Sequence, residues 1–194
     1  MNERVKKYFT NLLWLALGFF VIRCLISMPK TLYDVYGCIG ETISVTVIFA
    51  CIYEKWLWRY NPLQKTPVLS KKYTGTLKSS YDNIEREASL QVKQTLFTVQ
   101  IILTSGESKS KSISSSLDDI LGEQQLTYCY LNTPNAEVRH RSEIHYGTAM
   151  LSVDDPKVLK GQYFTDRKTI GDMVFNAVLK DEKNTFKIKA KDIA

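Results

Sequence analysis

FTNLLWLALGFFVIRCLISM, residues 9–28, is a stretch of about twenty residues that carries a single charge, Arg23. A helix of about this length crosses a hydrocarbon core of roughly 30 Å. A cleaved signal peptide also begins with basic residues and an apolar stretch, but this stretch is too long and no small-residue cleavage site follows it. Residues 9–28 are therefore predicted to span a membrane.

A second apolar segment follows after a short connection at residues 29–35. It reads YGCIGETISVTVIFACIYEKWLW, residues 36–58, and Glu41 interrupts it, so a buried or interfacial helix is the alternative to a span. We interpret it as a return span, because the connection is short and because Trp56, Trp58 and Tyr60 lie where an interfacial aromatic belt is expected. Residues 1–60 are thus expected to form a two-helix membrane hairpin.

Charged residues suggest how the hairpin is oriented. Basic residues precede the first span and follow the second, whereas the connection holds only Lys30 and Asp34. By the positive-inside rule both termini are expected in the cytoplasm. Arg23 and Glu41 lie about five residues inside the outer ends of the two spans, at a similar depth of roughly 7 Å. Charges at such depth pair or reach for the interface. For Arg23 and Glu41 the sequence leaves three arrangements open: a pair within one hairpin, a pair between neighbouring hairpins, or two side chains that reach the interface independently.

The chain beyond the hairpin reads as one small strand-rich domain. Residues 61–71 are expected to be a linker, 72–181 a domain and 182–194 a charged tail. About 130 residues suffice for one compact core. Alternating apolar and polar residues predict half-buried strands. These strands are expected at residues 72–81, 85–94, 96–104, 124–131, 141–153, 159–167 and 172–179.

The serine-rich segment GESKSKSISSS, residues 106–116, allows a flexible linker or a strand, and we favour the strand. A short helix is expected at residues 117–121, with Ser116 as its N-cap and Gly122 as its stop. Tight turns are expected at residues 132–135 and 154–157. Together these patterns predict a membrane-anchored all-β fold, with two transmembrane helices followed by a small antiparallel barrel of about eight strands and one short helix.

The chemistry of the chain points away from catalysis. His140 and His145 belong to no metal spacing or triad and are interpreted as surface or turn residues. The four cysteines form no zinc or disulfide pattern. The net charge of +6 is modest, and the basic residues form no pattern typical of binding to duplex DNA or RNA. We expect no enzyme, no metal and no cofactor.

The interior of a barrel of about eight strands either is filled by side chains or holds one small ligand. Tyr128 and Tyr130 share a strand face, as do Tyr163, Thr165 and Arg167. A cavity lined by tyrosine, serine and threonine with a single arginine suits a compact anionic ligand that carries rings, such as a nucleotide. The alternative is that these tyrosines pack as ordinary barrel residues.

Several segments carry a resemblance to a known family. The two spans, the exit WLWRYNP (56–62) and the segments KYTGTLKSSY (72–81), QVKQTLFTVQIILTSGESKSKS (91–112), LTYCYLNTPN (126–135) and LKGQYFTDRKTIG (159–171) resemble the two-transmembrane β-barrel effectors of bacterial CBASS antiphage defence. The resemblance covers nearly the whole chain and implies a lipocalin- or avidin-like receptor for a cyclic oligonucleotide, expected to be a cyclic dinucleotide. Ligand binding would drive homo-oligomerisation and disruption of the bacterial inner membrane, killing the infected cell.

Candidate ligand residues follow from the faces of the expected strands rather than from a motif of the family. Arg167 is the principal candidate. Leu77 stands where avidin-like barrels often carry an aromatic residue, which leaves the stacking partner open. Two other classes remain alternatives: a membrane-anchored carrier or sensor for a small apolar ligand, and a scaffold that binds a protein. The full candidate set is Thr104, Ser110, Ser112, Tyr128, Tyr130, Tyr163, Thr165 and Arg167.

Overall fold

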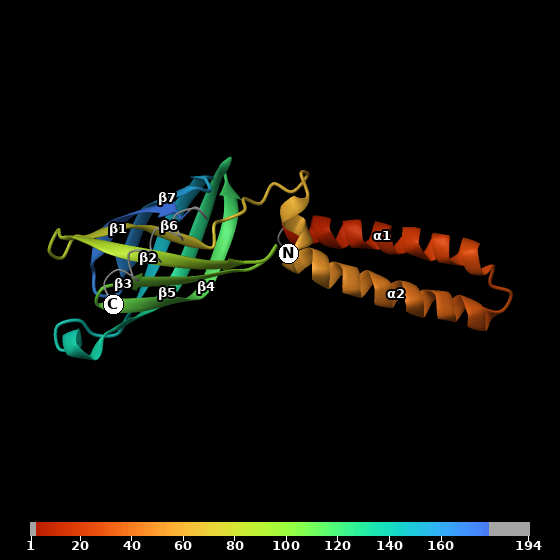
Figure 1. Cartoon of the computed structure of the whole chain (residues 1–194), viewed down its shortest axis with the longest axis horizontal. Coiled ribbons are helices and arrows are strands. Elements are labelled where there is room, and N and C mark those ends of the chain that lie inside the picture. Colours follow the sequence, from red (N-terminus) through yellow and green to blue (C-terminus); the bar gives the residue numbers. More distant parts are fainter. Residues whose placement is uncertain (1–2, 179–194) are drawn as a thin grey trace, which may run out of the picture. The chain divides into compact units, whose positions relative to one another are not determined.

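The computed structural model describes residues 3–178, which form two compact units (Figure 1). Residues up to 64, together with 95–97, form a helical unit, and the other described residues from 65 onward form a β-barrel. The charged tail expected at residues 182–194 lies outside the described residues.

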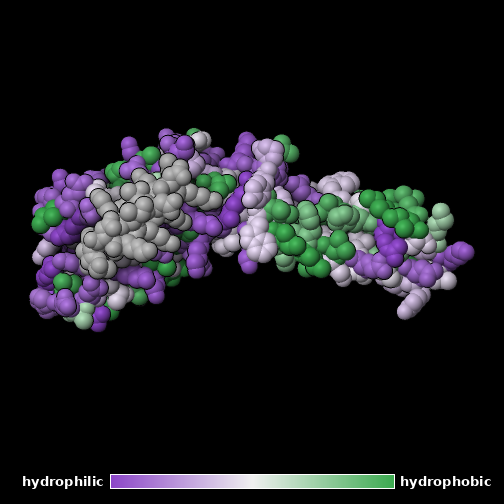
Figure 2. Space-filling view, viewed as in Figure 1, coloured by the Kyte–Doolittle hydropathy of each residue, from purple (hydrophilic) through white to green (hydrophobic). Residues whose placement is uncertain are grey.

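The helical unit is a hairpin of two antiparallel helices, α1 (Glu3–Ser27) and α2 (Leu32–Lys55). Both helices are long and apolar enough to cross a membrane, judged by length and composition. Large apolar side chains along them, such as Leu13, Trp14 and Ile26, are exposed, and Figure 2 shows this apolar surface. An apolar surface of this extent is typical of contact with lipid or another protein.

The hairpin bends earlier than the sequence pattern predicted. The Thr31 hydroxyl accepts a hydrogen bond from the Asp34 backbone N–H, and the Asp34 carboxylate accepts one from the Thr31 N–H. This capping box starts α2 at Leu32, whereas the apolar pattern placed the start at Tyr36. The helix ends at Lys55 and is followed by a short 3-10 helix (η1, Leu57–Tyr60), in which Trp58 is buried and Tyr60 is exposed.

Arg23 and Glu41 form an ion pair between the two helices of one hairpin. Arg23 Nε donates to Glu41 Oε2, and Arg23 Nη2 lies 3.3 Å from Glu41 Oε1. Of the arrangements that the sequence left open, the structure therefore has the pair within a hairpin. Two donors of one guanidinium on one carboxylate fix the geometry as well as the charge balance.

The barrel unit is a closed sheet of eight strands, each antiparallel to its neighbours in sequence, with β8 closing on β1. The predicted fold class, two helices and a small antiparallel barrel, is confirmed. Inward-facing side chains alternate with outward-facing ones along each strand. The strands are β1 (Lys72–Ser79), β2 (Glu85–Gln94), β3 (Val99–Ser105), β4 (Ser108–Ile120), β5 (Glu123–Pro134), β6 (His145–Asp155), β7 (Val158–Thr165) and β8 (Ile170–Ala177).

The helix expected at residues 117–121 is wrong. Residues up to Ile120 continue β4, and Leu117 faces the core opposite Leu126. Leu121 and Gly122 both have positive φ angles, 55° and 93°, and form a two-residue hairpin turn. Gly122 therefore supplies a turn conformation rather than a helix stop, because positive φ at both central positions suits a tight β-hairpin.

Serine hydroxyls on β4 form hydrogen bonds to the backbone of β3 where the two strands do not pair directly. The strands pair directly over only Ile102 to Thr104, and β4 has an irregularity between Ser112 and Ser114. Beyond it, the Ser112 hydroxyl accepts from the Ile101 N–H at 2.9 Å, and the Ser115 hydroxyl donates to the Val99 carbonyl. The strand favoured for the serine-rich segment is confirmed, and its hydroxyls replace ladder hydrogen bonds that the bulge interrupts.

One end of the barrel is filled by packed side chains. Tyr73 reaches across this end: its hydroxyl accepts from the Ser70 N–H at 2.8 Å and donates to the Pro156 carbonyl at 2.7 Å. Apolar residues pack beside it, and the barrel is therefore solid here. The fully buried members are Leu90, Ile101, Leu126, Leu151, Val153, Leu159 and Phe175.

Candidate ligand-binding cavity

A cavity of about 280 Å³ opens at the other end of the barrel, where β1, β3, β5 and β7 end and β2, β4, β6 and β8 begin. The turns after the odd-numbered strands form its rim, and the inward faces of the strands form its walls. Its size is close to the lower end of the range for small-molecule sites. The lining combines charged, hydroxyl and aromatic side chains with a few apolar ones, Leu77, Leu103, Pro134, Val138 and Met173.

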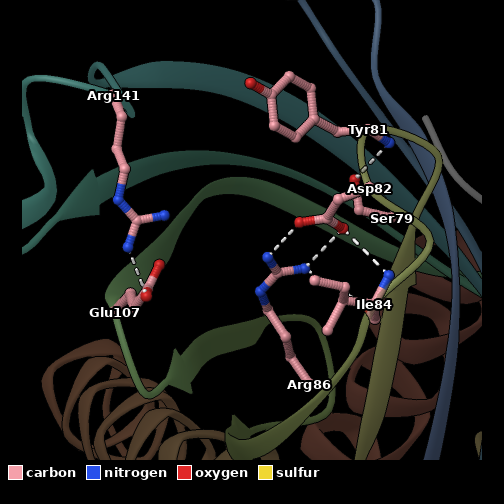
Figure 3. A network of polar contacts seen from close by, with 7 residues as sticks. All are labelled: Ser79, Tyr81, Asp82, Ile84, Arg86, Glu107 and Arg141. Atoms are coloured by element: carbon pink, nitrogen blue, oxygen red, sulfur yellow. Dashed lines mark hydrogen bonds and ion pairs between the residues drawn. The ribbon is translucent and has the colours of Figure 1, made fainter.

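Arginine and carboxylate side chains form the charged rim of the cavity (Figure 3). Arg86 Nη1 lies 3.0 Å from Asp82 Oδ1, and its Nη2 bonds the other carboxylate oxygen. Arg141 Nη2 lies 2.7 Å from Glu107 Oε1. Arg167 has its Nη1 3.5 Å from the Ser142 hydroxyl and makes no ion pair with any residue in 3–178. Arg167 is thus the rim cation whose charge is not balanced by a paired carboxylate.

The Arg86 guanidinium lowers the pKa of Asp82 to about 2, chiefly through the hydrogen bonds that it donates to the carboxylate. In turn, the hydrogen bond to Asp82 raises the pKa of Arg86. Both side chains are therefore charged at neutral pH. An anionic ligand that reached Arg86 would compete with a carboxylate that is already in place.

Two tyrosine rings lie close over glycines of the neighbouring strands. Tyr130 on β5 is paired with Gly147 on β6, and a Cβ at position 147 would overlap the Tyr130 ring. Tyr163 on β7 is paired with Gly171 on β8 in the same way. The absence of a side chain at the glycines leaves room for each ring, and both rings line the cavity wall as aromatic surfaces.

Tyr128 lies deeper, beside Tyr130, with 5.8 Å between the ring centroids. Its hydroxyl is buried and has no hydrogen-bond partner among the described residues. Burial raises the pKa of Tyr128 far above its ordinary value. The group is therefore a neutral hydroxyl that lines the cavity and whose hydrogen-bonding capacity the protein leaves unused.

A row of buried polar side chains crosses three strands between the rim and the tyrosines. Ser110 on β4 faces Asn132 on β5, which faces His145 on β6. The Ser110 hydroxyl lies 2.9 Å from Asn132 Oδ1, and Asn132 Nδ2 lies 3.5 Å from His145 Nε2. His145 Nδ1 lies 2.9 Å from the Glu143 carbonyl oxygen. Burial lowers the pKa of His145, so the imidazole is favoured in its neutral form.

The structure brings six of the eight candidate residues to the cavity lining, namely Ser110, Tyr128, Tyr130, Tyr163, Thr165 and Arg167. Thr104 is absent from the lining, because Leu103 and Ser105 on either side of it take the inward positions. Ser112 is absent because the bulge directs its hydroxyl to the backbone of β3. The inward facing expected for Thr104 and Ser112 is therefore wrong.

Sequence reasoning missed other residues of the cavity. His145 was interpreted as a surface or turn residue, but it is 7% exposed and begins β6. The alternation of His145, Gly147, Ala149, Leu151 and Val153 carries the signal that would have placed it inside. Asn132 was assigned to a turn that in fact begins after Pro134, the last residue of β5. Arg86 carries the same kind of signal, because it alternates with Ala88 and Leu90 on the inward face of β2. Asp82, Glu107 and Arg141 carry no comparable signal, since their rim positions depend on how the turns fold over the barrel.

The cavity offers cations at its rim, hydroxyls and an amide below them, and aromatic rings on its walls. Arginine forks bind phosphate oxygens through paired hydrogen bonds, and aromatic rings stack on bases. Among residues 3–178, no group of three or more His, Cys, Asp or Glu side chains could hold a metal ion. The arrangement therefore fits recognition of a phosphate-bearing, ring-bearing molecule.

Comparison with known proteins agrees with this geometry. Residues 64–177 match the sequence model of a family described as Cap15, cyclic dinucleotide receptor domain. The chain is also 28% identical over 177 residues to CD-NTase-associated protein 15 of Staphylococcus schleiferi, an alignment that covers 89% of this chain and 97% of that protein. The match to the receptor domain spans the whole barrel with its cavity. This chain belongs to the Cap15 family of cyclic dinucleotide receptors, effectors of CBASS antiphage defence.

Proposed function

We propose that the barrel cavity binds a cyclic dinucleotide with its phosphates at the arginine rim and its bases against the tyrosine walls. Binding then drives chains to assemble through their hairpins, and the assembled hairpins disrupt the inner membrane and kill the infected cell. Both termini and the barrel lie in the cytoplasm in this proposal. The observation that carries it is the unbalanced Arg167 cation above the flat rings of Tyr130 and Tyr163.

The charge distribution of the rim supports phosphate binding. A cyclic dinucleotide carries two phosphates, each of which can accept paired hydrogen bonds from a guanidinium. Arg167 is available to the first phosphate without the loss of an existing ion pair. Arg86 and Arg141 are paired with carboxylates, so the second phosphate must share or displace one of those pairs.

The hairpin supports the membrane half of the proposal. Its two helices satisfy the length and composition of membrane spans, and the distribution of basic residues favours cytoplasmic termini. A ligand shifts a protein toward an assembled state only to the extent that it binds that state more tightly. The cyclic dinucleotide is therefore expected to bind more tightly to the assembled form than to the isolated chain.

Calorimetric titration of the full-length protein in lipid nanodiscs with a panel of cyclic dinucleotides tests the binding step. We expect submicromolar binding of at least one member. Arg167→Ala should weaken that binding by about tenfold or more, since hydrogen bonds to charged groups contribute roughly 1.5–3 kcal/mol. Lys160→Ala, which removes a cation from the exposed outer face of β7, is the matched control and should bind as the wild type does.

A folded protein that binds no member of the panel would overturn the proposal and favour a carrier for an apolar ligand or a protein scaffold. Unchanged affinity in Arg167→Ala would overturn the assignment of the phosphate site. The membrane step is tested by release of an entrapped dye from liposomes that contain the protein. Release that follows ligand addition supports the proposal, and intact liposomes at saturating ligand would contradict it.

A further inference from the structure

We propose that Asn132 is the residue that reads the base of the cyclic dinucleotide, and that Ser110 and His145 act as positioning residues that hold its amide in one orientation. The inference rests on the proposed function of the cavity. It assigns base discrimination to one side chain, distinct from the arginines that contact phosphate.

Hydrogen bonding fixes the orientation of the amide step by step. The Glu143 carbonyl can only accept a hydrogen bond, so His145 Nδ1, 2.9 Å away, carries the proton. In the neutral imidazole Nε2 is then an acceptor, and the atom of Asn132 that faces it must be the Nδ2 donor. The amide oxygen is thereby turned to Ser110, whose hydroxyl donates to it at 2.9 Å.

The orientation leaves half of the amide available. An amide group has two N–H donors and an oxygen with two lone pairs. One N–H of the Asn132 amide donates to His145 Nε2, and one lone pair of the amide oxygen accepts from the Ser110 hydroxyl. The described residues supply no other partner for the Asn132 side chain. One donor and one acceptor remain side by side. This pair is complementary to a base edge that carries an adjacent acceptor and donor, as in the bidentate recognition of adenine by asparagine.

The position of Asn132 in the cavity favours a base over a phosphate. The side chains of β5 that line the cavity are, in order towards the rim, Tyr128, Tyr130, Asn132 and Pro134. Asn132 therefore lies between the tyrosine walls and the rim cations. A base that stacks on a tyrosine ring would bring its edge to the neutral amide, whereas the negatively charged phosphates are attracted to the arginines. Hydrogen bonds to the base edge carry the sequence information that phosphate contacts lack.

Base discrimination can be measured separately from affinity. Full-length protein in nanodiscs is titrated with four cyclic dinucleotides of one linkage, each with two copies of uracil, adenine, guanine or cytosine. We expect the wild type to prefer one base by about tenfold or more, the range that a bidentate contact provides. Asn132→Leu, of similar volume, should bring the four affinities to within about threefold of one another, mainly by weakening the preferred ligand.

Two variants serve as comparisons. Arg167→Ala should weaken all four ligands by a similar factor and leave the preference intact, because it removes a phosphate contact. Asn176→Leu makes the same substitution at an exposed position of β8 and should change neither affinity nor preference. Thermal unfolding verifies that each variant is folded.

The positioning role of Ser110 is tested by the ratio of the affinities for the preferred and least preferred ligands. Ser110→Ala removes only the hydroxyl that orients the amide oxygen, and it should lower the preference ratio while the affinity for the least preferred ligand stays unchanged. It also provides the test if Asn132→Leu does not fold. A merely structural role would weaken all four ligands together.

The possible results separate the two proposals. If no cyclic dinucleotide binds the wild type, the proposed function fails and the role of Asn132 fails with it. If ligands bind but the wild type shows no base preference, or if the preference survives in both Asn132→Leu and Ser110→Ala, the role of Asn132 is wrong while the receptor function stands.

Discussion

Tyr73 and Tyr128 are both buried in the barrel, but their hydroxyls have different surroundings. The Tyr73 hydroxyl has two backbone partners, whereas the Tyr128 hydroxyl has none among the described residues. A buried hydroxyl without a partner costs roughly 1–3 kcal/mol of desolvation, and a satisfied one is costly to remove. The same substitution is therefore expected to have opposite effects at the two positions.

Tyr128→Phe should raise the stability of the ligand-free protein by about 1 kcal/mol, because it removes the unsatisfied group and leaves the ring. For a domain of this size this corresponds to a rise in Tm of roughly 4 °C. Tyr73→Phe is the matched comparison and should lower the Tm, since it leaves the Ser70 N–H and the Pro156 carbonyl without their partner. Thermal unfolding of full-length protein in detergent measures both. A lower Tm in Tyr128→Phe would mean that its hydroxyl is bonded in the folded protein.

The ionisation of Asp82 makes the stability of the folded protein depend on pH. Its pKa falls from 3.8 in the reference state to about 2 in the folded protein, so the folded state binds fewer protons in that interval than the unfolded chain. The stabilisation is present above about pH 4 and is lost as the pH falls toward about 2. Asp82→Asn should lower the Tm at neutral pH and make its decline between about pH 4 and pH 2 shallower. An equally steep decline in the variant would contradict the assignment to Asp82.

At the scale of elements, the β5–β6 pair forms much of the cavity wall. Tyr130 lies over Gly147, so the position of this ring depends on a missing side chain in the neighbouring strand. The segment that connects the two strands, residues 135–144, contributes Val138, Arg141 and Ser142 to the lining. Arg141 in this connection is held by Glu107, which lies in the turn between β3 and β4.

Gly147→Ala should displace the Tyr130 ring, since the new Cβ would overlap it and would also lie 2.9 Å from the Phe164 carbonyl oxygen. Overpacking of this kind costs roughly 1–3 kcal/mol. We expect a lower Tm together with weaker cyclic dinucleotide binding by calorimetry. Gly106→Ala is the control, because a Cβ there meets nothing within 4 Å, and it should change stability by no more than about 0.5 kcal/mol. Equal behaviour of the two variants would show that Tyr130 moves aside freely.

At the scale of the whole molecule, the receptor barrel and the hairpin must act together for the proposed effector function. Among the described residues of the hairpin, Arg23 and Glu41 form an ion pair within a segment that is otherwise largely apolar. Charges within a membrane segment are costly unless they are paired or reach water. The pair is therefore expected to maintain the helix packing on which the proposed assembly would depend.

Arg23→Glu and Glu41→Arg should each abolish most of the ligand-induced dye release from liposomes, because each places two like charges opposite one another. The double exchange restores an opposite-charge pair and should recover much of the release. Calorimetric binding of the cyclic dinucleotide in detergent should stay close to that of the wild type in all three proteins, since the barrel is unchanged. Failure of the double exchange to recover release would show that the pair itself is not what matters.

The helical hairpin, the barrel and most inward-facing residues could be predicted from the sequence, because these features depend on local patterns. A run such as residues 9–28 is long enough to span a membrane wherever it lies, and alternation sets the face of Tyr128, Tyr130 and Tyr163 without knowledge of the partner strands. The same local rules failed where two patterns compete. Residues 117–121 carry capping signals for a helix, but pairing with β5 holds residues 117–120 in a strand, and Leu121 begins the hairpin turn.

The chemistry of the cavity could not be predicted in the same way, because it depends on contacts between residues that are distant in the sequence. The bulge at Ser112 changes which serines face inward, and a local pattern does not reveal it. Glu107 and Arg141 meet at the rim although 34 residues separate them, because antiparallel closure brings alternate turns to one end of the barrel. The row of Ser110, Asn132 and His145 exists for the same reason, because three strands in register place these side chains opposite one another. Their burial then makes the hydrogen bonds between them stronger than they would be in water.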